Sequence, residues 1–169
     1  MTLLLIAIIV FSVAGDQVSK ALIFGHDSAF IPGLIRFEST KNQGMAWGLM
    51  HGVSWFLPAV SVLTGIVIVL LLVLLFRSGK HMSAGIRIGF ACVIGGAIGN
   101  LIDRVSLGYV RDFICTEFIE FPVFNVADIF VTCGGILLAV LLIFTKSGHR
   151  FFNYLLAEPS KKKNEPKEN

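Results

Sequence analysis

The sequence predicts an all-α membrane protein, with four transmembrane helices and a small β-containing cradle or flap outside the membrane. Two observations predict this class: 55% of the 169 residues are hydrophobic while only 15% are charged, and four apolar runs are long enough to cross a bilayer. A chain of this length is expected to form one domain. We assign that domain to residues 1–145, with an outer loop or cradle at 25–52, and expect a partly disordered basic tail at 146–169.

The four predicted spans differ in what interrupts their apolar sequence. The first runs from about Leu3 to Phe24 and becomes polar in its last third. The second, Val53–Phe76, contains no charged residue. The third, from about Ser83 to Asp103, is rich in glycine, which lets neighbouring helices pack closely. The fourth starts near Asn125 and continues to Thr145.

The loop between the first two spans, residues 25–52, is too long for a simple connection. Its segment Ala29–Ser39 has strand-forming residues on both sides of Pro32–Gly33, and Trp47 follows, a residue type favoured at membrane interfaces. We therefore predict a small β-containing flap at the interface, which holds an extended substrate segment over the polar ends of the spans.

Basic residues predict the orientation of the chain. The linker 77–87 holds three Lys or Arg residues and the tail holds six more, and four spans place both on the same side. The positive-inside rule makes that side cytoplasmic, so both termini are expected in the cytoplasm. The basic tail predicts contact with membrane lipids rather than with nucleic acid.

This topology brings polar residues from three helix ends together near the outer face of the membrane. Ionisable groups at the edge of the hydrocarbon layer are costly and usually mark a functional site. Residues four positions apart share one helical face, as in the pairs Asp16–Lys20 and Asn100–Arg104. The converging residues are Asp16, Lys20, Asn100, Asp103, Arg104, Asn125 and Asp128.

The residue types present favour acid–base chemistry by carboxylates. The sequence contains no HExxH motif and no GxxxxGK loop, and none of its four histidines is placed to activate a serine at membrane depth. Two carboxylates held close together share one proton. The ionised member then activates a water molecule, while the protonated member donates to the scissile carbonyl. This aspartic mechanism needs no metal, and we expect no cofactor.

Two other classes of protein stay open on these residues alone. A small transporter or proton-coupled channel also gathers Asp, Asn and Arg between helices. It would need charge to continue into the cytoplasmic half of the spans, which is nearly free of charge. A metal-dependent lipid phosphotransferase is the third option, and sensitivity to a chelator would reveal it.

Five sequence blocks occur in order between residues 16 and 128: DQVSK (16–20), NQGMAWG (42–48), GGAIGNLIDR (95–104), GYVRDF (108–113) and FNVAD (124–128). Together they resemble the blocks of bacterial lipoprotein signal peptidase, also called signal peptidase II. The resemblance implies an inner-membrane aspartic endopeptidase with four transmembrane helices. Such an enzyme removes the signal peptide of a lipoprotein precursor just before its diacylglyceryl-modified cysteine. We also expect inhibition by globomycin-type compounds, and a monomer, since one chain supplies the whole site.

The resemblance assigns roles to individual residues. It implies that Asp112 of the GYVRDF block and Asp128 of the FNVAD block are the catalytic aspartates. It implies supporting roles for Asp16, Lys20, Asn42, Gly44, Asn100, Asp103, Arg104 and Asn125. Two residues depart from the family pattern: Arg111 stands where an apolar residue is expected, and Trp47 stands where phenylalanine is commoner. Arg111 is near enough in sequence to alter the pKa of Asp112.

Each assignment also has a simpler structural interpretation. Asn125 and Asp128 form the N-x-x-D pattern of a helix N-cap. Asp112 can simply pair with Arg104 or Arg111 in a hydrated loop. Three further pairs have structural interpretations: Asp16–Lys20 as an orienting pair, Asp103–Arg104 in an ion-pair network, and Asn42–Gly44 in a turn.

Overall fold

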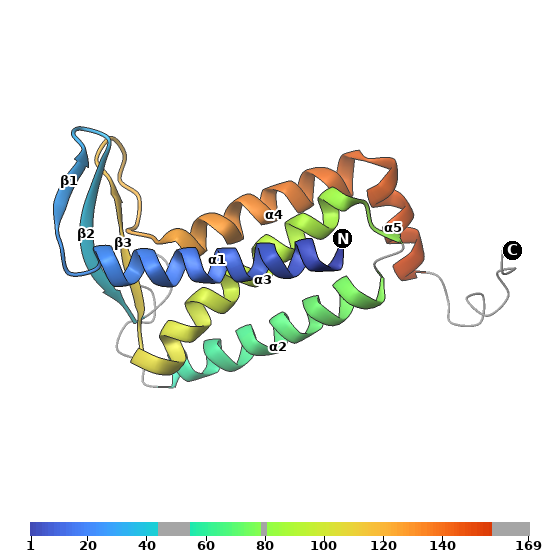
Figure 1. Ribbon diagram of the computed structural model, residues 1–169, viewed down its shortest axis with the longest axis horizontal. Helices are drawn as coiled ribbons and strands as arrows, with labels where there is room; N and C mark the ends of the chain where they lie inside the picture. The colour runs from blue at the N-terminus through green and yellow to red at the C-terminus, as the bar shows by residue number, and fades with distance from the viewer. Residues whose placement is uncertain (44–54, 79–80, 157–169) are drawn as a thin grey trace, which may run out of the picture.

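The computed structural model describes residues 1–43, 55–78 and 81–156. Within these residues, five helices and three strands follow in the order α1 (Thr2–Ile23), β1 (Ser28–Ile31), β2 (Ile35–Asn42), α2 (Phe56–Arg77), α3 (Ala84–Leu107), β3 (Val110–Thr116), α4 (Val126–Phe144) and α5 (Lys146–Leu156). Four long helices form a bundle, with the sheet at one end and α5 at the other (Figure 1).

Four helices, α1 to α4, are long and apolar enough to cross a membrane. The four predicted spans are therefore confirmed, with ends that shift by one to four residues. The largest shift is at the end of α3, which continues past the charged residues Asp103 and Arg104. It ends at Gly108, whose left-handed φ of 75° favours glycine and whose N–H donates to the Arg104 carbonyl.

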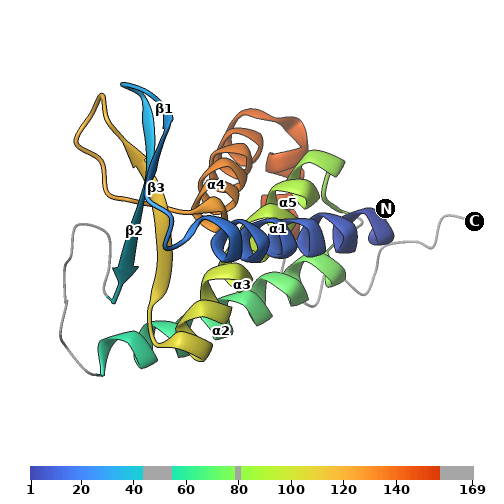
Figure 2. The ribbon, with the colours of Figure 1, turned by 60° about the vertical axis from the view of Figure 1, so that its left-hand side comes forward.

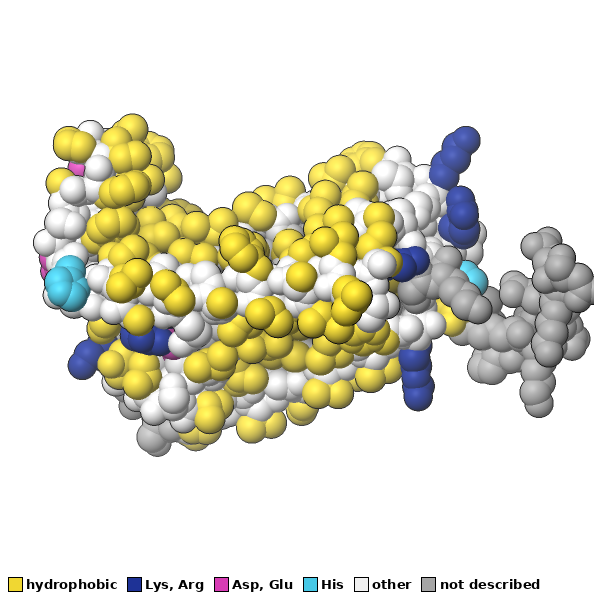
Figure 3. Space-filling model, viewed as in Figure 1, with side chains coloured by type: hydrophobic (Ala, Val, Ile, Leu, Met, Phe, Trp, Pro, Cys, Tyr) yellow, Lys and Arg dark blue, Asp and Glu magenta, His cyan; other side chains and the backbone are white. Residues whose placement is uncertain are grey.

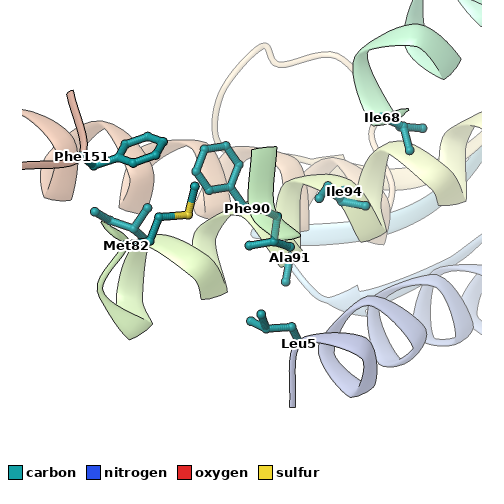
Figure 4. Packing of buried hydrophobic residues seen from close by; sticks show 9 residues of the cluster. Leu5, Ile68, Met82, Phe90, Ala91, Ile94 and Phe151 are labelled. Carbon is teal, nitrogen blue, oxygen red and sulfur yellow. The ribbon is translucent and has the colours of Figure 1, made fainter. Parts of the chain in front are cut away.

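α3 is the central helix of the bundle and packs against α1, α2 and α4. Its apolar face buries Ile86, Phe90 and Ile94 in a cluster that also contains Phe151 of α5 (Figure 4). The predicted packing role of its glycines is confirmed. A Cβ on Gly99 would lie 2.6 Å from Asp16 Oδ2, so this glycine lets a carboxylate of α1 lie directly against α3.

The sheet is antiparallel, with strand order β1-β2-β3, and lies across one end of the bundle (Figure 2). β1 and β2 confirm the predicted strand content around Pro32–Gly33 and pair as an antiparallel hairpin, in which Gly33 has a φ of 75°. β3 was not predicted, because the GYVRDF block was expected in a loop. It pairs with β2 in a register that places Asp112 beside Thr40 and Val110 beside Asn42.

The segment Lys146–Leu156 forms a helix, α5, that was not among the predicted elements. The part of the tail beyond it, residues 157–169, lies outside the described residues, as does the predicted disorder there. The part of the predicted flap that contains Gly44 and Trp47 lies outside them as well.

Candidate active site

Asp112 of β3 and Asp128 of α4 both accept a hydrogen bond from Asn125. The side-chain amide of Asn125 donates to Asp112 Oδ1 at 2.6 Å, and its backbone N–H donates to Asp128 Oδ2 at 3.1 Å. Asp112 is only 2% exposed and Asn125 is fully buried. The two aspartates that come from the last two sequence blocks therefore belong to one hydrogen-bonded site.

Asn125 holds this position because it is the N-cap of α4. Its Oδ1 accepts the backbone N–H of Asp128 at 3.0 Å, and the reciprocal bond from its own N–H to Asp128 completes a capping box. The structural interpretation of these two residues is confirmed. It does not exclude a functional one, because the oxygen of Asn125 caps the helix while its amide nitrogen remains for Asp112.

Asp112 is held from β2 as well as from α4. Asn42 lies at the end of β2, and its amide donates to Asp112 Oδ2 at 2.9 Å. Asn42 is thus part of a strand instead of the expected turn. Both oxygens of Asp112 accept a hydrogen bond from an asparagine, so the orientation of this carboxyl group is fixed.

Asn100 links the aspartates to a buried lysine. Its Oδ1 accepts from Lys20 Nζ at 3.0 Å and from Asn125 Nδ2 at 3.0 Å. Since the oxygen already serves two donors, the amide nitrogen must face an acceptor, and it donates to Asp128 Oδ1 at 2.7 Å. Asp128 therefore receives N–H donors on both of its oxygens.

Lys20 and Asp16 form an ion pair that also fixes the start of α4. Lys20 Nζ lies 2.8 Å from Asp16 Oδ2 and 3.4 Å from Asp103 Oδ2, with these side chains fully buried. Asp16 Oδ1 accepts the backbone N–H of Ala127 at 2.9 Å. A carboxylate at a helix N-terminus is favoured by the unpaired N–H groups there. The geometry agrees with the orienting pair expected for Asp16 and Lys20.

Arg111 pairs with Asp103 rather than with Asp112. Its guanidinium donates to both Asp103 oxygens, at 2.8 and 3.2 Å, and to Gln17 Oε1 at 2.9 Å. Successive side chains of a strand point to opposite faces, so Arg111 points away from the face of Asp112. Among the described residues, no salt bridge joins Asp112 to Arg104 or Arg111, so the expected arginine partner of Asp112 is wrong.

Gln17 is the residue of this network that sequence reasoning missed. Its amide nitrogen lies within hydrogen-bonding distance of Asp16 Oδ2, the Gly99 carbonyl and Asp103 Oδ1, at 3.0 to 3.3 Å. The signal was present in the DQVSK block, where a polar residue follows Asp16 in an apolar helix. The i,i+4 spacing that pairs Asp16 with Lys20 does not include Gln17, because neighbouring residues of a helix do not share a face.

Arg104 is half-buried, and within the described residues its Nε has no hydrogen-bond acceptor. Asp103 belongs to an ion-pair network, as expected, with Lys20 and Arg111 as its partners. No salt bridge joins Arg104 to a carboxylate of the described residues, but its charge interacts with those of Asp128, Asp112 and Asp103. A buried N–H group without a partner is costly, and a negative charge that develops nearby would relieve this cost.

Burial raises the pKa of Asp112 to about 7. The hydrogen bonds from Asn42 and Asn125 and the charge of Lys20 oppose the rise, while the charge of Asp128 reinforces it. The charge of Arg111 does not contribute appreciably, because Asp103 neutralises it. Near neutral pH, Asp112 therefore holds a proton for a large part of the time, as an acid catalyst must.

A four-span helical bundle in which a buried aspartate with a raised pKa lies beside a half-buried second aspartate defines a membrane-embedded aspartic peptidase. The comparisons with known proteins agree. The family model described as signal peptidase (SPase) II matches residues 8–144. The chain belongs to the lipoprotein signal peptidase family, also called signal peptidase II.

Individual relatives support this assignment. The lipoprotein signal peptidase of Enterococcus faecalis is 39% identical over 133 residues, which cover 76% of this chain and 80% of that protein. The one of Lactococcus lactis subsp. lactis is 37% identical over 149 residues, which cover 85% and 96%. A bacterial membrane enzyme solved by the in meso method has a TM-score of 0.73 at 33% identity, covering 82% of this chain and 87% of that one.

Family membership settles the class of function. The protein is an aspartic endopeptidase that cleaves the signal peptides of prolipoproteins, and it is a multi-pass bacterial membrane protein. The enzyme class predicted from the sequence is confirmed, and the transporter and phosphotransferase alternatives are set aside.

Proposed function

We propose that Asp112 and Asp128 are the two catalytic aspartates, and that they cleave the peptide bond just before the diacylglyceryl-modified cysteine of a prolipoprotein. The observation that carries this proposal is the shared Asn125, which donates to both carboxyl groups. Two carboxyl groups joined in this way can hold one proton between them and can both approach a single water molecule.

Asp128 is the ionised partner in this proposal. It accepts from the Asn100 amide and from the Asn125 N–H, and it lies in the first turn of α4. Hydrogen bonds and a helix N-terminus both favour a carboxylate. Asp112, with its pKa of about 7, is the protonated partner.

The reaction then proceeds in two steps. Asp128 takes a proton from water, whose oxygen bonds to the scissile carbonyl carbon, while Asp112 gives its proton to the carbonyl oxygen. In the tetrahedral intermediate, the C–N bond breaks as Asp128 passes its proton to the leaving nitrogen. A hydroxyl group returns its proton to Asp112, which restores the starting state.

The supporting residues have three roles in this proposal. Arg104 stabilises the negative charge that develops on the carbonyl oxygen before Asp112 has fully transferred its proton, because its guanidinium is half-buried near both aspartates. Asn42 and Asn125 orient Asp112, and Asn100 orients Asp128. A third group holds the helices that carry the site, and it consists of Asp16, Lys20 and Asp103. The family resemblance gives Gly44 a place beside the substrate.

We infer the orientation of the enzyme from its charges. Among the described residues, the end that carries α5 has four Lys or Arg and no acidic residue, and the sheet end has five Lys or Arg and eight acidic residues. Basic side chains project around the α5 end in Figure 3. This asymmetry supports cytoplasmic termini and an active site toward the extracytoplasmic face of the inner membrane. The family resemblance supports a monomer of one domain, 1–145, that is open to globomycin-type inhibitors.

Cleavage of a synthetic diacylglyceryl prolipoprotein by the purified full-length protein in EDTA tests the proposal. We expect Asp112→Asn and Asp128→Asn each to lower kcat/KM at least about a thousandfold. Asp27→Asn is the matched control, because Asp27 is an exposed aspartate that accepts the backbone N–H of Ser39 in β2, and it should keep full activity. Full activity in either Asp112→Asn or Asp128→Asn would remove that residue from catalysis.

A further inference from the structure

α5 lies beyond the part of the chain that the signal peptidase II model matches, which ends at residue 144. It is nevertheless a docked helix with a defined start. Thr145 ends α4 with an extended backbone, and its hydroxyl accepts the N–H of Gly148 at 3.1 Å. A side chain at Gly148 would collide with the carbonyl oxygens of Leu141 and Leu142, so α5 turns directly against the end of α4.

One face of α5 is fixed against the bundle. Phe151 is 2% exposed and packs edge-to-face on Phe90, with ring centroids 6.4 Å apart (Figure 4). Tyr154 stacks on His81 at 3.8 Å. Ser147 Oγ accepts the N–H of Ser83, the N-cap of α3, at 3.2 Å. These contacts decide which remaining side chains of α5 face outward.

The outward side chains divide into two sectors. At 3.6 residues per turn, the exposed apolar residues fall on one side of the helix and the exposed polar residues on another. The apolar sector consists of Phe152, Leu155 and Leu156, which are 58%, 44% and 70% exposed. The polar sector consists of Lys146, His149, Arg150 and Asn153.

The location of α5 indicates what covers the apolar sector. The helix begins two residues after the end of the apolar span α4, and therefore at the boundary of the hydrocarbon layer. An amphipathic helix at this level, with basic residues on its polar face, is typical of helices that lie in the membrane interface. Arg77 and Arg87, at the adjoining ends of α2 and α3, add positive charge at the same level.

We propose that α5 is an interfacial helix that binds anionic lipid headgroups at the end of the bundle opposite the active site. Its apolar sector enters the acyl region beside α4, and its basic residues bind the headgroup phosphates. This proposal does not depend on which aspartates are catalytic.

A first experiment tests whether lipid covers the apolar sector. Phe152→Cys and Asn153→Cys are placed separately in the full-length protein in phosphatidylcholine–phosphatidylglycerol vesicles. Each is labelled with a membrane-impermeant maleimide, and mass spectrometry locates the label. Both positions are exposed in the protein itself, so a difference in labelling reports the membrane. Both also share one helix, so the ratio does not depend on orientation in the vesicle.

We expect Asn153→Cys to label at least about fivefold faster than Phe152→Cys, at every lipid-to-protein ratio. Equal labelling would overturn the interfacial position. If Phe152→Cys is protected only at low lipid-to-protein ratios, a second copy of the chain covers the apolar sector. That result would also overturn the proposal.

A second experiment tests the preference for anionic lipid. The protein is extracted from mixed vesicles, and the ratio of phosphatidylglycerol to phosphatidylcholine that remains bound is measured. We expect enrichment about twofold or more above the bulk ratio, and its loss in Lys146→Gln/Arg150→Gln. The matched control, Arg36→Gln/Lys41→Gln, removes two exposed positive charges from the sheet end and should keep the enrichment. Equal effects of both double variants would contradict a headgroup site on α5.

Discussion

Asn125 illustrates how one side chain serves both the fold and the site. Its oxygen caps α4, and its nitrogen bridges Asp112 to Asn100. An amide is suited to this because it presents an acceptor and two donors on one rigid group. The N-x-x-D pattern is a helix cap, and this cap is compatible with the proposed catalytic role because it orients the carboxyl group of Asp128.

At Asp112, the protonation state is linked to the stability of the fold. Burial, reinforced by the charge of Asp128, raises its pKa to about 7, while an aspartate in an unfolded chain has a pKa of about 4. A group whose pKa is higher in the folded protein stabilises the fold at low pH. That contribution is fully present below about pH 4 and is lost as the pH rises through 7.

We expect Asp112→Asn to remove the loss of stability that the ionisation of Asp112 causes as the pH rises. The variant has no ionisable group at position 112, so its free energy of unfolding relative to the wild type should rise by about 1–4 kcal/mol between pH 4 and pH 8. At pH 4 the variant should be no more stable than the wild type, because Asn keeps only one of the two acceptor oxygens of Asp112. Thermal unfolding of the purified proteins in detergent at both pH values measures the difference. A difference between variant and wild type that is the same at pH 4 and pH 8 would contradict the raised pKa of Asp112.

At the scale of elements, β3 is fastened to the helices through Arg111. The guanidinium contacts Asp103 of α3 and Gln17 of α1, while the backbone N–H of Arg111 also donates to Asp103 at 2.9 Å. Because side chains alternate along a strand, fixing Arg111 toward the helices turns Asp112 toward the asparagines. The arginine that departs from the family pattern thus has a structural use in this chain.

Arg111→Met is expected to loosen β3. It removes three side-chain hydrogen bonds and leaves Lys20 as the charged partner of buried Asp103. We expect kcat to fall about tenfold with little change in KM, because Asp112 is less well positioned. The free energy of unfolding should fall by about 1–3 kcal/mol. Peptide-cleavage kinetics and thermal unfolding measure both effects.

Two companion variants separate positioning from charge alone. Arg111→Lys keeps the charge but loses the two-pronged contact, and should restore part of the activity and stability. Arg36→Met removes an arginine that is 47% exposed and pairs with Glu38, and should change stability by no more than about 0.5 kcal/mol. Wild-type kcat in Arg111→Met would show that β3 needs no such contact.

The spans and the outer hairpin were predictable because their signals are local. Apolar length gives the four helices, and strand-forming residues around Pro32–Gly33 give β1 and β2. β3 was missed because its partner strand lies about 70 residues earlier in the chain, and no local pattern reports such pairing. α5 was missed because it is short, lies within a charged tail and has too few apolar residues to predict a buried face.

The residues of the site were predictable, but not their pairings. The topology of four spans was enough to bring Asp16, Lys20, Asn100 and Asp128 to one end. The position of Asp112 depends on β3, so the family resemblance supplied it and spacing did not. The acidic partners of the arginines could not be predicted, because a guanidinium side chain is long enough to reach any of several carboxylates. Only three-dimensional packing decides that choice.

At the scale of the whole molecule, the two ends of the bundle differ in charge. All eight acidic residues of the described chain belong to the sheet end, and Glu120, in the connection from β3 to α4, is exposed there. Asn153 is exposed at the other end, on α5. The two positions therefore report opposite faces of the membrane.

Labelling of whole cells tests the orientation. In spheroplasts that produce the full-length protein, an impermeant maleimide should modify Glu120→Cys at least about tenfold faster than Asn153→Cys, as the positive-inside rule requires. Disruption of the membrane should make Asn153→Cys reactive, which controls for intrinsic reactivity. Preferential labelling of Asn153→Cys in intact spheroplasts would reverse the assigned orientation.

The hydrogen bond that the Ala127 N–H donates to Asp16 joins α1 to α4. Asp128 is the next residue, and the cap that orients it is made only by residues 125–128. In the proposed mechanism neither aspartate acts alone, so a chain that has inserted only its first three spans would hold Asp112 without its catalytic partner. We therefore expect proteolytic competence only after α4 inserts and the N–H of Ala127 reaches the carboxylate of Asp16.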